Sequence, residues 1–342
     1  MTYPCPACGE LAGPDDGYCE VCGAELAPAA VSSGVGGAHE CPVCSADGRR
    51  TSNNPPAGIT PEGYCESCGR KVPSGRDREE LDVGLAAGVT DRGLRHARNE
   101  DAMALAAVRV SGEPVALAVV CDGVSSAPRA DEASLAAVRA AARSLLSAVR
   151  AGGDRAAASA AAVRAAGTAV GDLTSPAGAP AATYASAVVD GTVVTVCWLG
   201  DSRVYWLAAD GSSSRCLTAD DSIAEELIAG GLATVEEAMA SPQAHVITRW
   251  LGADLPEPEP HVARFEPSGQ GVVLLCSDGL WNYQPEATEL AAMALPAALT
   301  DPAAVAAALV KFAVDAGGAD NITTVLMPFP PAWPETSPRS EQ

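Results

Sequence analysis

The fold is decided by the stretch Val115-Ala116-Leu117-Ala118-Val119-Val120-Cys121-Asp122-Gly123, a run of apolar residues that ends in Asp-Gly. A short apolar run closed by turn residues predicts a buried strand followed by a turn. The pattern recurs at 271–279, where a second apolar run ends in Ser-Asp-Gly. A carboxylate at the end of a buried strand is held rigidly and partly desolvated, which suits a hard divalent cation. The two stretches therefore predict core strands with metal-binding carboxylates at their ends.

Two more carboxylates stand in a similar setting, beside Asn and next to an apolar run. They are Asp101 in Asn99-Glu100-Asp101 and Asp320 in Ala319-Asp320-Asn321. A single Asp in such a turn is more often structural than a ligand. Four of them in one acidic chain, Asp101, Asp122, Asp278 and Asp320, favour a site for divalent metal ions.

Length and charge limit the classes of protein that this chain can belong to. Its 342 residues have room for one catalytic domain and a small module. The formal net charge of −21 disfavours nucleic acid or an anionic membrane as a general partner, because like charges repel at the encounter. The N-terminus lacks a basic segment followed by an apolar run, and no long uninterrupted apolar stretch follows elsewhere. We expect a cytoplasmic protein.

Short β-like runs and long alanine-rich stretches together predict an α+β domain. Tight reversals at Asp190-Gly191 and Gly200-Asp201-Ser202 predict that its sheets are largely antiparallel. Strands are expected at 115–121, 185–189, 192–199, 204–207, 271–276 and 322–327, and helices at 130–151, 154–173, 286–295 and 302–316.

Eight of the twelve cysteines lie in the first 68 residues, as four Cys-x-x-Cys pairs that form an internal repeat. Four thiolates in two pairs are the ligand set of a closed, structural zinc site, and each copy resembles a zinc ribbon. The predicted ligands are Cys5, Cys8, Cys19 and Cys22 for one zinc ion, and Cys41, Cys44, Cys65 and Cys68 for a second. The remaining cysteines, which lie singly in apolar runs, are expected to be core residues: Cys121, Cys197, Cys216 and Cys276.

These patterns divide the chain into a double zinc ribbon at 1–72 with a tether at 24–39, a linker at 73–82, a catalytic domain at 83–328 and a proline-rich tail at 329–342. Zinc ribbons often bind nucleic acid. The first 72 residues, however, hold nine acidic and four basic residues, a formal charge of −5. This charge favours a protein-docking or regulatory module over a nucleic-acid-binding regulator.

Seven motifs, in order, resemble those of the type 2C metal-dependent protein serine/threonine phosphatases. They are Thr90-Asp91-Arg92-Gly93 with Asn99-Glu100-Asp101, Val119-Val120-Cys121-Asp122-Gly123, Leu199-Gly200-Asp201-Ser202-Arg203-Val204-Tyr205, Leu217-Thr218, Thr248-Arg249-Trp250-Leu251-Gly252, Leu275-Cys276-Ser277-Asp278-Gly279-Leu280 and Ala319-Asp320-Asn321-Ile322-Thr323. The resemblance spans 83–327 and leaves out the zinc ribbons. It implies an α-β-β-α sandwich of two largely antiparallel sheets flanked by helices, with two manganese or magnesium ions between the sheets.

The resemblance also implies a role for each residue of the centre. Asp122 bridges both ions, and Asp101 and the Gly123 carbonyl complete the coordination. Asp278 and Asp320 bind one metal, and Glu100 acts through water. Two cations about 3.5–4 Å apart can share one water, lower its pKa and aim the resulting hydroxide at phosphorus, while their charge stabilises the phosphoryl oxygens. No cysteine lies in a Cys-x5-Arg phosphate cradle, which excludes a cysteine-dependent phosphatase.

This sequence departs from the family where the substrate phosphate is bound. The family places an arginine three residues before Asn-Glu-Asp, and this position is His96, with Arg95 and Arg98 beside it. A guanidinium holds phosphate through a planar set of donors that imidazole cannot copy, so Arg95 is the predicted substitute and His96 a neighbouring candidate. Val124 cannot donate the proton that a histidine after Asp-Gly supplies in some relatives, so solvent or His96 must donate it. A third metal site stays unassigned.

The leading hypothesis is therefore a metal-dependent phosphatase that acts on phosphoserine and phosphothreonine in proteins, with zinc ribbons that dock it to a partner. One alternative is a catalytically weak pseudophosphatase that binds phosphoproteins without turnover. The presence of every core ligand disfavours it. A second alternative, a nucleic-acid-binding zinc-ribbon regulator, is disfavoured by charge.

Overall fold

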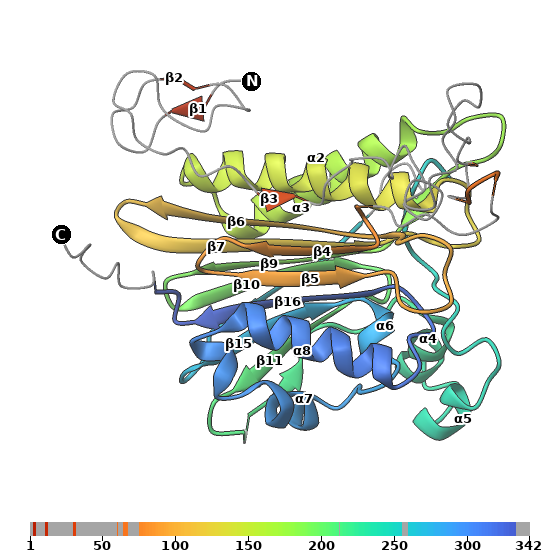
Figure 1. The fold of residues 1–342 in the computed structure, drawn as a ribbon. Helices are drawn as coiled ribbons and strands as arrows, with labels where there is room; N and C mark the ends of the chain where they lie inside the picture. The colour runs from red at the N-terminus through yellow and green to blue at the C-terminus, as the bar shows by residue number, and fades with distance from the viewer. Residues whose placement is uncertain are drawn as a thin grey trace.

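The chain forms two six-stranded sheets that pack face to face, with helices on the outer face of each (Figure 1). The structure, a computed structural model, describes residues 75–211, 213–254 and 259–332, together with 3–4, 11–12, 30–31, 60 and 64–67. Neighbouring strands of both sheets pair in antiparallel register. This arrangement confirms the expectation of antiparallel sheets flanked by helices.

The first sheet has the order β14-β10-β9-β7-β6-β3. Its strands are β3 (Ala30–Val31), β6 (Asp101–Val110), β7 (Glu113–Asp122), β9 (Tyr184–Asp190), β10 (Val193–Leu199) and β14 (His261–Phe265). The turn between β6 and β7 places Ser111 and Gly112 at positive φ, 52° and 91°, as a tight hairpin requires. The register of that hairpin pairs Asp101 with Asp122 at its open end.

The second sheet has the order β12-β11-β15-β16-β5-β4. Its strands are β4 (Arg78–Asp82), β5 (Ala87–Asp91), β11 (Arg203–Ala208), β12 (Arg215–Cys216), β15 (Gly271–Cys276) and β16 (Ile322–Phe329). Strand β4 occupies the second half of the segment expected as a linker at 73–82, which therefore ends before Arg78. Short pairs complete the β structure: β1 (Tyr3–Pro4) with β2 (Leu11–Ala12), and β8 (Ala181–Ala182) with β13 (Leu251–Gly252).

Two long helices, α2 (Ala130–Arg150) and α3 (Arg155–Gly171), cover the first sheet. The side chain of Asp154 caps α3 by accepting a hydrogen bond from the backbone of Ala157. The second sheet is covered by α6 (Asp278–Trp281), α7 (Ala287–Ala294), the 3₁₀ turn η1 (Ala297–Leu299) and α8 (Pro302–Asp315). The small helices α4 (Ile223–Ala229) and α5 (Val235–Met239) extend from the same end of the sandwich as α6 (Figure 1).

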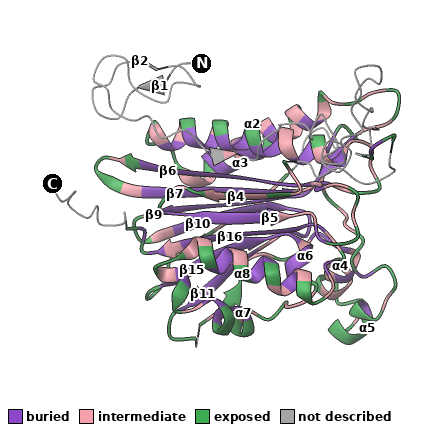
Figure 2. Cartoon of the chain, in the orientation of Figure 1, coloured by how far each residue is buried: buried purple, intermediate pink, exposed green. Residues whose placement is uncertain are grey.

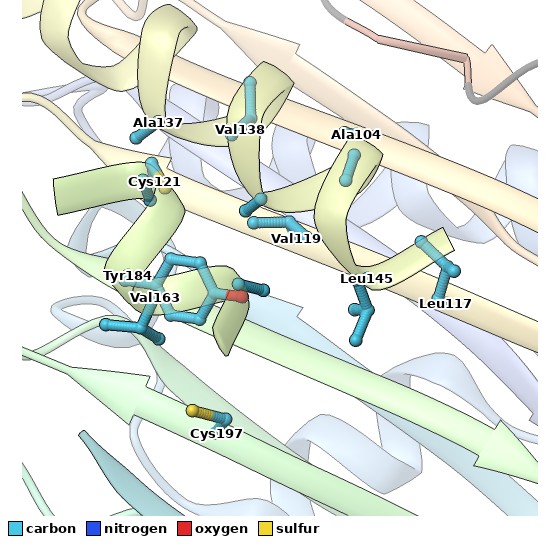
Figure 3. Packing of buried hydrophobic residues seen from close by; sticks show 14 of the residues in the cluster. Ala104, Leu117, Val119, Cys121, Ala137, Val138, Leu145, Val163, Tyr184 and Cys197 are labelled. Atoms are coloured by element: carbon cyan, nitrogen blue, oxygen red, sulfur yellow. The ribbon is translucent and has the colours of Figure 1, made fainter. Parts of the chain in front are cut away.

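Three apolar layers hold these elements together, and the buried residues run through the centre of both sheets (Figure 2). The layer between the first sheet and its helices joins Leu145 of α2 and Val163 of α3 to Val119 of β7 (Figure 3). Each buried Leu or Val contributes about 1.5–3 kcal/mol relative to an exposed one. Alanine on the helices lets them approach the sheet closely, which explains how a chain with 4% aromatic residues builds a dense core.

The structure departs from the expectations at further places besides β4, among them β5 and β14, which were not expected as strands. The alanine-rich β6 was not expected as a strand, and Ala30–Val31, expected in a tether, pairs with it as β3. Cys121, Cys197 and Cys276 are buried as predicted, but Cys216 lies on the edge strand β12 and is exposed, so that prediction was wrong. Of the eight predicted zinc ligands, only Cys65 falls among the described residues, where it is buried. Among these described residues, no helix is both long and apolar enough to cross a membrane.

Candidate metal centre and active site

The four predicted aspartates come from four different segments that meet at one end of the sandwich. Asp101 opens β6 and Asp122 closes β7, so the two are cross-strand partners in the first sheet. In the second sheet, Asp278 follows β15 and begins α6, and Asp320 lies two residues before β16. The side chain of Asp122 interacts with those of both Asp101 and Asp278, so the two sheets bring these carboxyl groups close together.

The protonation of this cluster is strongly shifted. Burial raises the pKa of Asp101 to about 6, although hydrogen bonds from Thr323 and Ser277 lower it. Burial also raises the pKa of Asp122 well above its ordinary value, with further increases from the charges of Asp101 and Asp278. Burial raises the pKa of Asp278 well above its ordinary value, and the charge of Asp320 raises it further. Carboxyl groups so close together, with so little water, hold protons more tightly than exposed ones do.

Two oxygens of the cluster are suited to a cation. Asp101 Oδ2 accepts hydrogen bonds of 2.7 Å from both Ser277 Oγ and Thr323 Oγ1. The other oxygen, Oδ1, is buried and has no hydrogen-bond partner, and the same is true of Asp278 Oδ1. In the ranges that the structure describes, no Lys or Arg forms an ion pair with Asp101, Asp122 or Asp278. Buried carboxylates without a counter-charge suit a divalent cation, because their attraction to it offsets the unfavourable free energy of their desolvation.

The same side chains do not yet enclose an ion. Across the described residues, no three His, Cys, Asp or Glu side chains are arranged closely enough to hold a metal ion. Burial and neighbouring charge raise the pKa of Asp122 and Asp278, which favours protons on these carboxyl groups when no cation is bound. Protons and metal ions compete for the same oxygens, so binding of a cation is expected to release protons.

The backbone around Asp122 is fixed on both sides by Thr183. Thr183 Oγ1 accepts a hydrogen bond of 3.0 Å from the Asp122 amide, and the Thr183 amide donates one of 2.8 Å to the Asp122 carbonyl. The next residue, Gly123, has no space for a side chain: a Cβ there would lie 2.4 Å from the Ala130 carbonyl oxygen and 2.8 Å from that of Glu100. Glycine at this position therefore lets the strand end and α2 approach closely.

Gly279 has the same function on the second sheet. A Cβ there would lie 1.9 Å from the Asn321 carbonyl oxygen, so only glycine lets the start of α6 contact the segment that carries Asp320. The Asn321 side chain accepts a hydrogen bond of 2.8 Å from the Glu100 amide. It thereby ties Asp320 to the segment Asn99-Glu100-Asp101.

Glu100 and His96 lie at the rim of the cluster. The imidazole of His96 is 3.1 Å from Asp320 through Nε2 and 3.8 Å from Glu100 through Nδ1. Ser125 Oγ donates a hydrogen bond of 2.5 Å to Glu100 Oε2. Glu100 is thus held beside the cluster by Ser125 and lies near His96.

The two arginines beside His96 differ in their contacts. Arg98 Nη1 forms an ion pair of 3.2 Å with Asp131 at the start of α2. Arg95 is exposed and makes no ion pair or hydrogen bond with the described residues. Arg95 is therefore the one that can bind a ligand without breaking an existing contact.

Several residues of the site were not predicted from the sequence. Ser277, Thr323 and Thr183 position the aspartates, and their role depends on which strands are neighbours. Asp201 is a further buried carboxyl group, whose pKa is raised to about 7 by burial and then by the charge of Asp220. A signal for Asp201 was present, because Leu199-Gly200-Asp201 also places a carboxylate at the end of an apolar run.

Comparison with known proteins agrees with this geometry. The family model described as protein phosphatase 2C matches residues 92–312. The serine/threonine phosphatase Stp of Listeria innocua is 35% identical over 146 residues, which are 42% of this chain and 55% of that protein. The chain thus spans about half the length of this curated relative.

Two solved structures are similar over most of their length. The phosphatase MsPP of Mycobacterium smegmatis, in complex with cacodylate, is 30% identical with a TM-score of 0.57, over 72% of this chain and 99% of that one. The catalytic domain of the serine/threonine phosphatase PstP, in complex with two manganese ions, is 29% identical with a TM-score of 0.56, over 70% of this chain and 96% of that one. The family match covers well over half of the chain and includes Asp101, Asp122 and Asp278. This chain belongs to the protein phosphatase 2C family.

Proposed function

We propose that this protein hydrolyses phosphate monoesters of serine and threonine in other proteins, with two manganese or magnesium ions as cofactors. The observation that carries the proposal is the contact of Asp122 with both Asp101 and Asp278 at the junction of the two sheets. The manganese ions in the PstP structure and the names of the phosphatase relatives support it.

In this proposal each carboxylate has a distinct task. Asp101, Asp122 and Asp278 would hold the ions, with Asp122 interacting with both of the others, and Asp320 and the Gly123 carbonyl would complete the ligand set. When bound, the two cations would lower the pKa of a water molecule and offset the charge of the phosphoryl oxygens. Glu100, hydrogen-bonded to Ser125, would hold a water at the rim.

The substrate phosphate would be bound by Arg95, which has no competing partner among the described residues. His96 lies on the other side of the same loop segment, against Asp320 and Glu100. This contact leaves the imidazole next to the metal site, where it can orient water or the leaving alcohol. Arg98 is not proposed to bind phosphate, since Asp131 already holds it.

For residues 1–72 we propose two structural zinc ions in a module that docks the enzyme to a partner protein. The proposal rests on the repeated cysteine pairs and on the acidic charge of the segment. A pull-down with this segment would identify the partner.

A pseudophosphatase that binds phosphoproteins without turnover remains the second candidate. The sequence disfavours it, because Asp101, Asp122, Asp278 and Asp320 are all present. The decisive experiment measures release of phosphate from p-nitrophenyl phosphate and from a phosphothreonine peptide, with and without manganese. Metal-dependent turnover is expected, and a protein that binds the peptide and manganese but releases no phosphate would contradict the proposal.

A further inference from the structure

Arg76 lies in the segment between the predicted zinc-binding module and β4, yet its side chain is only 13% exposed. Its guanidinium donates two hydrogen bonds to backbone carbonyls, from Nη2 to Asp101 at 3.2 Å and from Nη1 to Asp131 at 3.0 Å. One side chain thus joins the first residue of β6 to the first turn of α2.

A second contact closes a ring around Asp101. The Arg76 carbonyl accepts a hydrogen bond of 3.1 Å from Asn99 Nδ2, and Asn99 Oδ1 accepts one of 3.2 Å from the Asp101 amide. Both the amide and the carbonyl of Asp101 are therefore held through Arg76, directly or through one intermediate. The backbone of Asp101 cannot rotate without breaking one of these bonds.

The orientation of this backbone determines where the Asp101 carboxylate points. Its Oδ2 is held by Ser277 and Thr323, which come from the second sheet. Its buried Oδ1 has no partner among the described residues. We propose that Arg76 is a positioning residue that keeps Asp101 Oδ1 directed towards a metal ion and so increases the metal affinity of the centre.

This inference rests on the proposed function, because it assumes that Asp101 is a metal ligand. An arginine is suited to the task since its planar guanidinium can reach two carbonyls at once, whereas a lysine ammonium acts as a single point of charge. Some residues contact a metal ligand and orient it without binding the metal themselves. Replacing such a residue commonly changes the metal affinity by about 10–100-fold.

The test compares full-length Arg76→Met and Arg76→Lys with a matched control, Arg78→Met. Arg78 is two residues away and, within the described part of the chain, its side chain forms surface ion pairs with Glu80 and Asp91. Calorimetric titration of each metal-free protein with manganese measures the dissociation constant, and circular dichroism verifies folding. We expect manganese affinity to fall by about 10-fold or more in Arg76→Met, to fall less in Arg76→Lys and to be unchanged in Arg78→Met.

An unchanged manganese affinity in a folded Arg76 variant would overturn the proposal, including the case in which thermal stability alone is reduced. If Arg76→Met does not fold, Arg76→Lys decides, because it keeps the charge but cannot span both carbonyls. Failure of the proposed function gives a different result, since the unaltered protein would then release no phosphate from a phosphothreonine peptide in the presence of manganese, whatever the manganese affinity of the Arg76 variants.

Discussion

Asp101 and Asp122 are cross-strand partners at the open end of the hairpin formed by β6 and β7. Side chains directly opposite in an antiparallel pair lie on the same face of the sheet, and two ionised carboxylates in this position repel each other. A cation between them would attract both carboxylates and so replace this repulsion with attraction. The stability of this end of the hairpin should therefore be higher with a bound cation than without one.

Asp122→Asn should abolish catalysis. The amide removes the negative charge shared by both proposed ions, so metal-dependent turnover of a phosphothreonine peptide should fall by about 100-fold or more. Steady-state kinetics over a range of manganese concentrations measure the loss. The control is Asp172→Asn, an exposed residue at the end of α3. Full activity of Asp122→Asn would remove the basis of the proposed mechanism.

Arg95→Gln should raise KM for a phosphopeptide by about 10-fold, equivalent to about 1.4 kcal/mol of binding free energy, with a smaller change in kcat. Arg98→Gln should change KM less, because Arg98 is already paired with Asp131. Parallel kinetics on the two variants give the ranking. If Arg98→Gln has the larger effect on KM, the assignment of the phosphate-binding residue is wrong.

The titration of Asp201 should make metal-free stability depend on pH. Its pKa in the folded protein is raised to about 7 from an ordinary 3.8, so the folded state holds this proton more tightly than the unfolded state does. Its ionisation therefore lowers the free energy of unfolding as pH rises through that interval, by at most about 1.4 kcal/mol per pH unit.

Thermal melts of the metal-free protein from about pH 5 to about pH 8 test this expectation against Asp201→Asn, which does not titrate. The unaltered protein should lose more stability than the variant as pH rises. If the thermal stability of the two proteins changes with pH to the same extent, Asp201 does not contribute to the pH dependence of stability.

Gly279→Ala should destabilise the fold and the site together. The new Cβ would meet the Asn321 carbonyl oxygen at 1.9 Å, and neither backbone can move away without displacing Asp278 or Asp320. We expect a loss of about 1–3 kcal/mol in the free energy of unfolding, measured by denaturant titration. Gly171→Ala, at the end of α3 with nothing within 4 Å of its Cβ, is the matched control and should be neutral or slightly stabilising.

Deletion of residues 1–74 should leave metal-dependent phosphatase activity in the remaining chain. Arg76 and all four aspartates are retained, and the two sheets lose only the short strand β3. Initial rates with a phosphothreonine peptide measure the effect. Complete loss of turnover in a folded truncated protein would show that the N-terminal segment takes part in catalysis.

The sequence was most informative where a local pattern suffices. The apolar runs that end at Asp122 and Asp278 predict both a strand and a functional carboxylate, and the long helices α2, α3 and α8 follow from length and composition. Strand β6 was missed because its alanines favour a helix locally. It is a strand because β7 supplies hydrogen bonds and both its faces are buried, and neither fact is visible in a local window.

Contacts between distant segments were also beyond prediction. Ser277 and Thr323 are 46 residues apart yet bond to the same oxygen of Asp101. Their part in the site follows from the pairing of β15 with β16, which a single sequence does not specify. Arg76 was assigned to a linker for the same reason, because its partners at Asp101 and Asp131 lie far along the chain.

The pairing of Ala30–Val31 with β6 has a consequence for how copies of this protein behave towards one another. Strand β6 is ten residues long and would otherwise end the first sheet, with Ala104 and Leu105 offering unpaired backbone groups to any extended chain. Exposed edge strands promote self-association of folded proteins. Strand β3 pairs with two residues of this edge, so a truncated form that lacks β3 should expose them and self-associate at lower concentrations than the full chain.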